Sequence, residues 1–139
     1  MIFLRRGITD ELLDAVWLGL CDVGTDNMVW ASPGTLATYL FPFNVIGGYD
    51  EDGECIGAVW FHGKDIHIAL SPECRKTWAS RHLLKQFFTA FFAQSDEAEV
   101  FVNTEGGHKF VKALGFRRHE TEDGNTRYTL RRDHARFYD

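Results

Sequence analysis

The stretch from Ser71 to Phe87, SPECRKTWASRHLLKQF, resembles a phosphate-binding turn that leads into a helix. The first amides of a helix and the positive end of its dipole attract phosphate. A turn that brings its backbone close to a ligand favours glycine, because glycine has no Cβ in the way. Trp78 and Ser80 occupy the positions where such a turn would hold glycine. The sequence therefore predicts the shape of an anion-binding turn without its usual glycines.

The three cysteines offer little further chemistry. Cys21, Cys55 and Cys74 are widely spaced and form no C-x-x-C pair, so we expect free thiols and neither a zinc site nor a disulfide framework. Cys74 comes just before a helix start and beside Arg75, a setting that favours the thiolate. His82 lies about two helical turns away, and no orienting acid is evident. A Cys-His nucleophile is therefore a remote hypothesis, and no metal site is expected.

Length and charge exclude several classes of protein. The chain has 139 residues and no repeat or linker, so we expect one domain spanning residues 1–139. Its net charge of -5 argues against bulk nucleic-acid binding, which needs a basic surface. The N-terminus MIFLRRGITDELL lacks the apolar core of a signal peptide, and no apolar run reaches transmembrane length. We therefore expect neither secretion nor membrane association.

Periodicity and turn residues predict alternating strands and helices. Thr9 caps a helix whose apolar residues share one face, and Asp50-Glu51-Asp52-Gly53 is typical of a hairpin turn. Phe41 and Phe43 are expected in the core. The predicted elements are strands near 2–4, 43–49, 55–61, 65–70, 99–102, 116–121 and 126–132, and helices near 9–20, 35–40, 76–94 and 107–114. This order predicts an α/β (α+β) fold with a mixed sheet and helices on both faces.

The same order, with three short motifs, resembles the GNAT acyltransferase superfamily over nearly the whole chain. The motifs are LSPECR before the long helix, FVKALGF before the last hairpin, and RRGITDELL from Arg5 to Leu13. The resemblance implies a mostly antiparallel central sheet. It also implies a loop of type Arg-x-x-Gly-x-Gly that holds the pyrophosphate of coenzyme A. Laid on this chain, the loop and the strand end before it correspond to Leu70, Arg75, Lys76, Thr77, Trp78, Ala79 and Ser80.

Departures from the family's pattern favour a vestigial site with no bound cofactor. An indole at Trp78 would crowd the pyrophosphate. The tyrosine that commonly protonates the leaving thiolate is replaced by Val111, next to Phe110, and only His108 nearby could substitute. Candidates for the family's general base are His67, His62 and Glu54. His62 and His67 would point to opposite faces of a continuous strand, so they predict no metal pair. No catalytic residue is assigned on this interpretation.

The C-terminal half of the chain resembles a smaller group within this superfamily. EVFVNTEGGHKFVKALGFRRHETEDGNTRYTL is similar to short GNAT-like head-assembly or internal virion proteins of tailed bacteriophages. The resemblance implies a non-catalytic protein, located in the virion or the bacterial host cytoplasm, whose partners are other virion or assembly proteins. Candidate contact segments are residues 28–30, 39–43 and 134–139. The alternative is an acyl-CoA-dependent N-acyltransferase with a degenerate loop, which would use acetyl-CoA.

Overall fold

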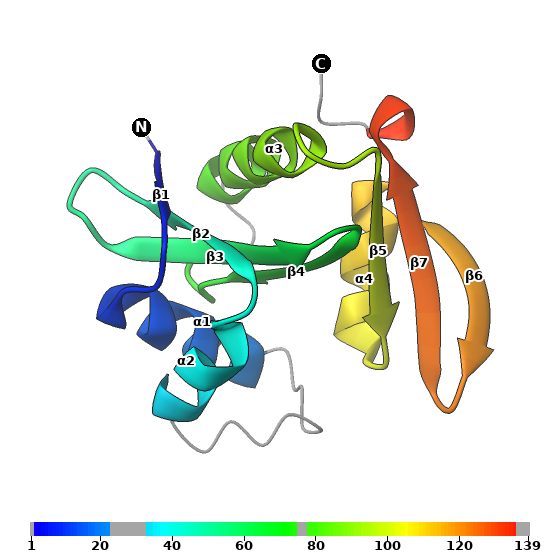
Figure 1. Ribbon diagram of the computed structural model, residues 1–139, viewed down its shortest axis with the longest axis horizontal. Helices are drawn as coiled ribbons and strands as arrows, with labels where there is room; N and C mark the ends of the chain where they lie inside the picture. Colours follow the sequence, from blue (N-terminus) through cyan, green and yellow to red (C-terminus); the bar gives the residue numbers. More distant parts are fainter. Residues whose placement is uncertain (1, 23–32, 75–77, 136–139) are drawn as a thin grey trace.

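The computed structural model describes residues 2–22, 33–74 and 78–135 and shows a mixed α/β architecture (Figure 1). Every predicted element is present with the predicted type, at bounds shifted by a few residues. The elements are β1 (Phe3–Arg6), α1 (Asp10–Asp22), α2 (Pro33–Leu40), β2 (Asn44–Tyr49), β3 (Cys55–His62), β4 (Asp65–Leu70), α3 (Trp78–Phe92), β5 (Glu97–Val102), α4 (Glu105–Leu114), β6 (Arg117–Glu122), β7 (Asn125–Arg131) and a 3-10 helix (Arg132–His134). Within the described ranges, no helix is long and apolar enough to cross a membrane.

The seven strands form one sheet in the order β1-β2-β3-β4-β5-β7-β6. Neighbouring strands are antiparallel except β4 and β5, which are parallel. The residues within two of the hairpin turns account for the shape of these turns. In the β2–β3 turn, Oδ1 of Asp50 accepts the backbone N–H groups of Asp52 and Glu54 at 2.9 and 3.0 Å. In the β6–β7 turn, Asp123 and Gly124 have φ of 52° and 81°, a conformation that an Asp-Gly pair adopts readily.

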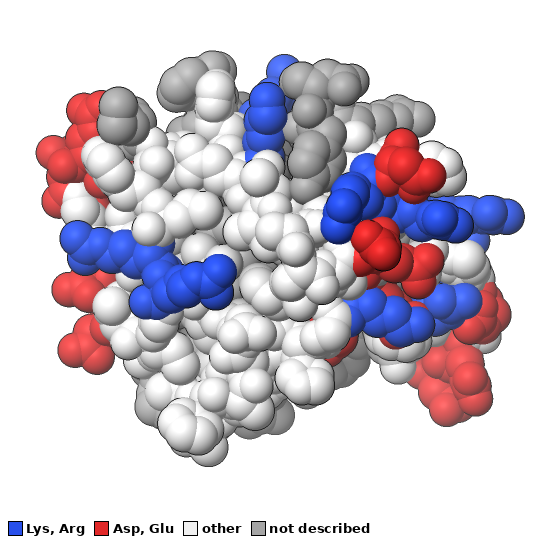
Figure 2. Space-filling view, turned by 45° about the horizontal axis from the view of Figure 1, so that its top comes forward, with Lys and Arg blue, Asp and Glu red and all other residues white. Residues whose placement is uncertain are grey.

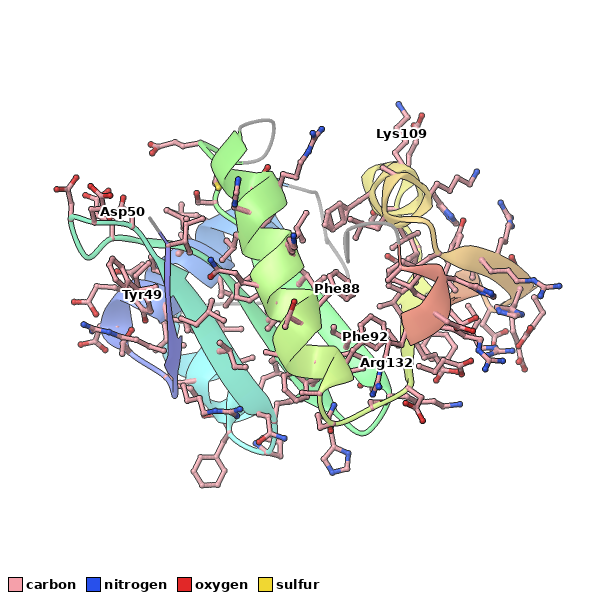
Figure 3. All side chains as sticks on the ribbon, turned by 90° about the horizontal axis from the view of Figure 1, so that it is seen from above. Tyr49, Asp50, Phe88, Phe92, Lys109 and Arg132 are labelled. Carbon is pink, nitrogen blue, oxygen red and sulfur yellow. The ribbon has the colours of Figure 1, made fainter. Side chains whose placement is uncertain are left out.

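Two apolar cores cover the two faces of the sheet. Helices α1 and α2 pack under β2, β3 and β4, with Leu12, Val16 and Trp60 among the buried residues. Helices α3 and α4 pack on the opposite face. In Figure 3, Phe88 and Phe92 lie on the side of α3 that faces β5 and the 3-10 helix. Both are fully or almost fully buried in the larger core. The predicted arrangement with helices on both faces is confirmed.

Some predicted details need correction. In α3, Leu83 is fully buried, whereas its neighbour Leu84 is only partly buried. The reason is the 3.6-residue period: Leu83 lies one turn before Phe87 on the face that meets the sheet. Phe41 is 85% exposed, so its placement in the core was wrong, while Phe43 is half-buried. The predicted contact segment at 28–30, and residues 136–139 of the predicted contact segment 134–139, lie outside the described residues.

Candidate active site

The two parallel strands β4 and β5 separate almost as soon as they meet. Their only register pair is Asp65 with Glu99, and the backbone N–H of Glu99 donates to the carbonyl of Lys64 at 2.7 Å. Beyond this point the strands diverge (Figure 1). In the described part of the chain, the register of β4 with β5 therefore does not continue from Ile66 to Ala69. Such a strand edge can hydrogen-bond a ligand that carries amide groups.

Asp65 and His67 form a hydrogen-bonded pair on this strand. Residues two apart on a strand share a face, and here the face is the one covered by α1 and α2. The Oδ2 atom of Asp65 lies 3.1 Å from Nε2 of His67, and the two side chains are 42% and 31% exposed. With Nε2–H donating to the carboxylate, Nδ1 carries the lone pair. A partly exposed imidazole held by a carboxylate is the usual arrangement of a general base.

Aromatic rings surround His67. Its imidazole is stacked on the ring of Trp60, with centroids 5.6 Å apart and planes at 12°. The ring of Phe43 meets it edge-on at 5.8 Å. Trp60 is 1% exposed and directly opposite His67 in the register of β3 with β4. Sequence reasoning named His67 but missed Asp65 and Trp60. The i, i+2 spacing of Asp65 and His67 within one strand was the signal that could have found the pair.

Glu99 lies where β4 and β5 divide, but its carboxylate is engaged. Its side chain is 14% exposed and lies between Nζ of Lys64 at 3.5 Å and the Arg127 guanidinium at 3.1 Å. Arg127 also bonds Glu120 at 3.0 Å. Because two cations hold this carboxylate, Glu99 takes part in an ion-pair network that joins β5 to β7 and to the turn before β4.

The other two predicted bases, Glu54 and His62, differ in their distance from His67. Glu54 is exposed in the β2–β3 turn, away from the middle of β4. His62 ends β3, opposite Asp65 in the register, and so it shares a face with His67. The expectation of opposite faces was wrong, because the chain reverses between His62 and Asp65 instead of continuing as one strand. No group of three or more metal-ligating side chains occurs among the residues that the structure describes.

In the described residues, the predicted acid position on α4 holds two apolar side chains that cannot donate a proton. Val111 is buried and Phe110 is half-buried in the core. The Nδ1 atom of His108 lies 2.7 Å from the hydroxyl of Tyr128, which is fully buried. His108 therefore takes part in a structural hydrogen bond and is a poor substitute for the missing tyrosine.

The loop before α3 is only partly described. Arg75, Lys76 and Thr77 lie outside the described residues, as do the side chains of Trp78 and Ala79. Trp78 is the first residue of α3, and Ser80, in the first turn, is 9% exposed. The expected vestigial cofactor loop thus stays a prediction. Cys74 is 5% exposed, which does not suit a reactive thiol.

An acidic hollow of about 920 Å³ lies beside this loop. It is bordered by α1, the β2–β3 turn and the segment from Ser71 to Cys74. Figure 2 shows acidic side chains gathered at the end of the molecule that holds this turn. The carboxylates that line the hollow are Glu11, Asp14, Asp50, Glu51, Asp52, Glu54 and Glu73. Because like charges repel, these carboxylates disfavour a pyrophosphate within about 8 Å, the distance beyond which physiological salt largely screens exposed charges.

Cys55 also lines this hollow. Its thiol donates to the carbonyl of Gly57 at 3.3 Å. Burial raises the pKa of the Cys55 thiol from 9.0 to about 11, so the group is neutral at physiological pH. A neutral, partly buried thiol is inert, which makes Cys55 a packing residue of the hollow wall.

Comparison with solved structures defines the class of fold. The PaiA N-acetyltransferase of Thermoplasma acidophilum in complex with coenzyme A aligns with a TM-score of 0.67 at 14% identity, over 94% of this chain and 99% of that one. A GNAT superfamily phosphinothricin acetyltransferase of Sinorhizobium meliloti in complex with AcCoA gives 0.63 and 16%, over 94% and 88%. A chimera of the Vibrio cholerae spermidine N-acetyltransferase gives 0.71 and 14%, over 95% and 96%.

The chain therefore has the GNAT fold, as its sequence predicted. No family model and no curated protein matches the sequence. The solved structures described above are acetyltransferases, two of them with coenzyme A or its acetyl form, and none is a phage head protein. At identities of 14–16% this likeness establishes the fold.

Proposed function

We propose that the chain is an acyl-CoA-dependent N-acyltransferase in which His67 is the general base. The observation that carries this proposal is the Asp65–His67 pair at the point where β4 and β5 divide. The acetyltransferase activity of the structural neighbours supports it more than the non-catalytic interpretation that the sequence favoured.

The described residues allow acyl transfer from the thioester to an amine with the help of a general base. The amide groups of an acyl-CoA would bond the β4 edge, which places the thioester near the division of β4 and β5. The amine nitrogen attacks the thioester carbonyl carbon, its proton passes to Nδ1 of His67, and the C–S bond breaks to release the thiolate. Asp65 holds Nε2–H and stabilises the imidazolium that forms.

The rate would be modest, since the described part of α4 offers no acid to the thiolate. Positioned acid–base catalysis typically contributes about 10²–10⁴-fold. A thiol has an ordinary pKa near 8.5, so the thiolate is a tolerable leaving group and solvent can supply its proton. We therefore expect transfer that is slow but faster than the uncatalysed reaction.

Two measurements test the proposal. Titration calorimetry with millimolar acetyl-CoA should detect binding, and release of free CoA thiol in the presence of primary amines should report transfer. His67→Gln and Asp65→Asn should abolish or slow transfer while acetyl-CoA still binds. Absence of binding heat at millimolar acetyl-CoA would rule out the transferase.

A second candidate is a non-catalytic GNAT-fold protein that acts in phage head assembly or inside the virion, without a cofactor. It is supported by Trp78 and Ser80 at the glycine positions, by Val111 at the acid position and by the acidic hollow beside the loop. Its partners would be other virion or assembly proteins, with no bulk nucleic acid and no membrane. Mass spectrometry of purified particles and assembly intermediates decides this candidate, which fails if the polypeptide occurs only in host lysate.

A further inference from the structure

A continuous set of contacts runs from α2 to the imidazole of His67. The hydroxyl of Tyr39 on α2 accepts the indole N–H of Trp60 at 3.3 Å, and the two rings meet edge to face at 6.5 Å. Trp60 is stacked on His67, and Phe43 meets both Tyr39 and His67. These four rings come from α2, the loop after it, β3 and β4.

Trp60 is the most deeply buried of the four rings. Trp60 is 1% exposed, Tyr39 and Phe43 are half-buried, and the His67 side chain is 31% exposed. A fully buried indole whose N–H is bonded has little freedom to turn, because every alternative would leave that donor unsatisfied or open a cavity. Trp60 is thus a rigid surface against which the imidazole lies.

Two constraints together select one orientation of His67. The stack on Trp60 sets the plane of the imidazole, since offset stacking is favourable at this separation. The bond to Asp65 sets which nitrogen points along β4 toward the carboxylate. In the described residues Nδ1 has no hydrogen-bond partner, so this constraint leaves Nδ1 as the accepting atom.

Tyr39 supports this arrangement as a neutral phenol. Burial and then the charge of Asp65 raise the pKa of Tyr39, against the opposing effect of its bond to Trp60. The hydroxyl therefore does not compete with His67 as a base. Its hydrogen bond reaches His67 through Trp60, and the Tyr39 ring also packs on Phe43, which meets His67 edge-on.

We propose that Tyr39 and Trp60 are positioning residues that hold the His67 imidazole in one orientation, with Nε2–H on Asp65 and Nδ1 as the proton acceptor. That Nδ1 accepts the proton of an attacking amine rests on the transferase proposal above. The orientation itself does not depend on it and can be measured in the protein without substrate.

Nitrogen-15 NMR of histidine-labelled protein tests the orientation, with His67→Gln to assign the signals. In the wild type, neutral His67 should show the Nε2–H tautomer with narrow signals. Trp60→Leu should give a mixture of tautomers or broadened signals, and Trp60→Phe, which keeps a ring to stack on, should restore much of the wild-type pattern. If Trp60→Leu fails to fold, Tyr39→Phe is the milder variant and should give an intermediate change.

Phe61→Leu is the matched control. Phe61 is the next residue on β3, is 2% exposed and packs on Phe91 on the other face of the sheet. Its substitution should reduce stability as a core change does and leave the His67 signals unaltered. The proposal is overturned if Trp60→Leu leaves the His67 tautomer unchanged, or if Phe61→Leu changes it equally.

Kinetics separate this inference from the proposed function. If acetyl transfer to a primary amine is measurable, Trp60→Leu should lower kcat by up to about 100-fold with little change in KM for acetyl-CoA, as misplaced catalytic groups do. A His67 tautomer that depends on Trp60, in a protein without transfer activity, would support the positioning role and refute the transferase. Transfer activity with a His67 tautomer independent of Trp60 would refute the positioning role alone.

Discussion

Leu83 of α3 fills the space that a side chain at Gly48 of β2 would need. A Cβ built at Gly48 would overlap Cδ1 of Leu83, which is fully buried. Overpacking of a dense core typically costs about 1–3 kcal/mol. Gly48→Ala should therefore lower the free energy of unfolding by roughly this amount, measured by urea denaturation.

Two variants sharpen this prediction. Gly106→Ala is the control, because a Cβ there has nothing within 4 Å and lies in helix α4; it should raise stability by about 0.5–1 kcal/mol. Leu83→Ala alone should be costly, but Gly48→Ala should cost little more in that background. An equal cost of Gly48→Ala with and without Leu83 would show that the contact is not the cause.

Burial of the Cys55 thiol predicts a loss of stability in alkali. Its pKa is raised to about 11, above the 9.0 of an exposed thiol, so the unfolded chain releases this proton first as pH rises. The contribution is fully present below pH 9.0 and is lost as pH rises to about 11. Unfolding free energies of wild type and Cys55→Ser, measured across this range, should converge or cross as pH increases. A constant difference between them would contradict the raised pKa.

The acidic hollow predicts that neutral variants bind acyl-CoA more tightly. Glu54 and Glu73 line the hollow next to the loop before α3. Removing both charges should tighten acetyl-CoA binding by roughly two- to fourfold at low salt, and less at high salt. Glu105 and Glu122 lie outside the hollow, and their double Gln variant should leave affinity unchanged. Calorimetry at two salt concentrations measures the affinity of both double variants. An equal gain in affinity for the two would show that the charge of the hollow itself is not the cause.

The loop before α3 gives a test of the missing glycines. Trp78→Gly with Ser80→Gly should increase affinity for acetyl-CoA if bulk and backbone stiffness keep the pyrophosphate away. Trp78→Ala with Ser80→Ala separates these causes, since it removes bulk without adding backbone freedom. Unchanged calorimetric binding in both pairs would refute a blocked loop. The glycine pair should also be less stable than the alanine pair by about 1 kcal/mol per residue, because both positions are helical.

Much of the fold could be predicted because its signals are local. The helix over Asp10–Asp22 has a capping Thr9 and an apolar stripe, and the two hairpins have Asp-Gly turns. The candidate site was harder to predict from the sequence. His67 was named from its place on a strand. The expectation that His62 and His67 point to opposite faces treated residues 62–67 as one continuous strand, whereas the chain reverses between β3 and β4.

The sequence by itself determined the order of strands and helices, the GNAT-like fold, and the residues Trp78 and Ser80 at the expected glycine positions and Val111 at the expected acid position. Only the tertiary structure decided that Trp60 lies on His67, that Tyr39 bonds Trp60, and that carboxylates from α1, a hairpin turn and the loop before α3 share one hollow. The physical reason is the distance along the sequence between the residues that interact. Period and turn chemistry act between residues a few positions apart, whereas these contacts depend on strand register and helix packing, which the whole core sets.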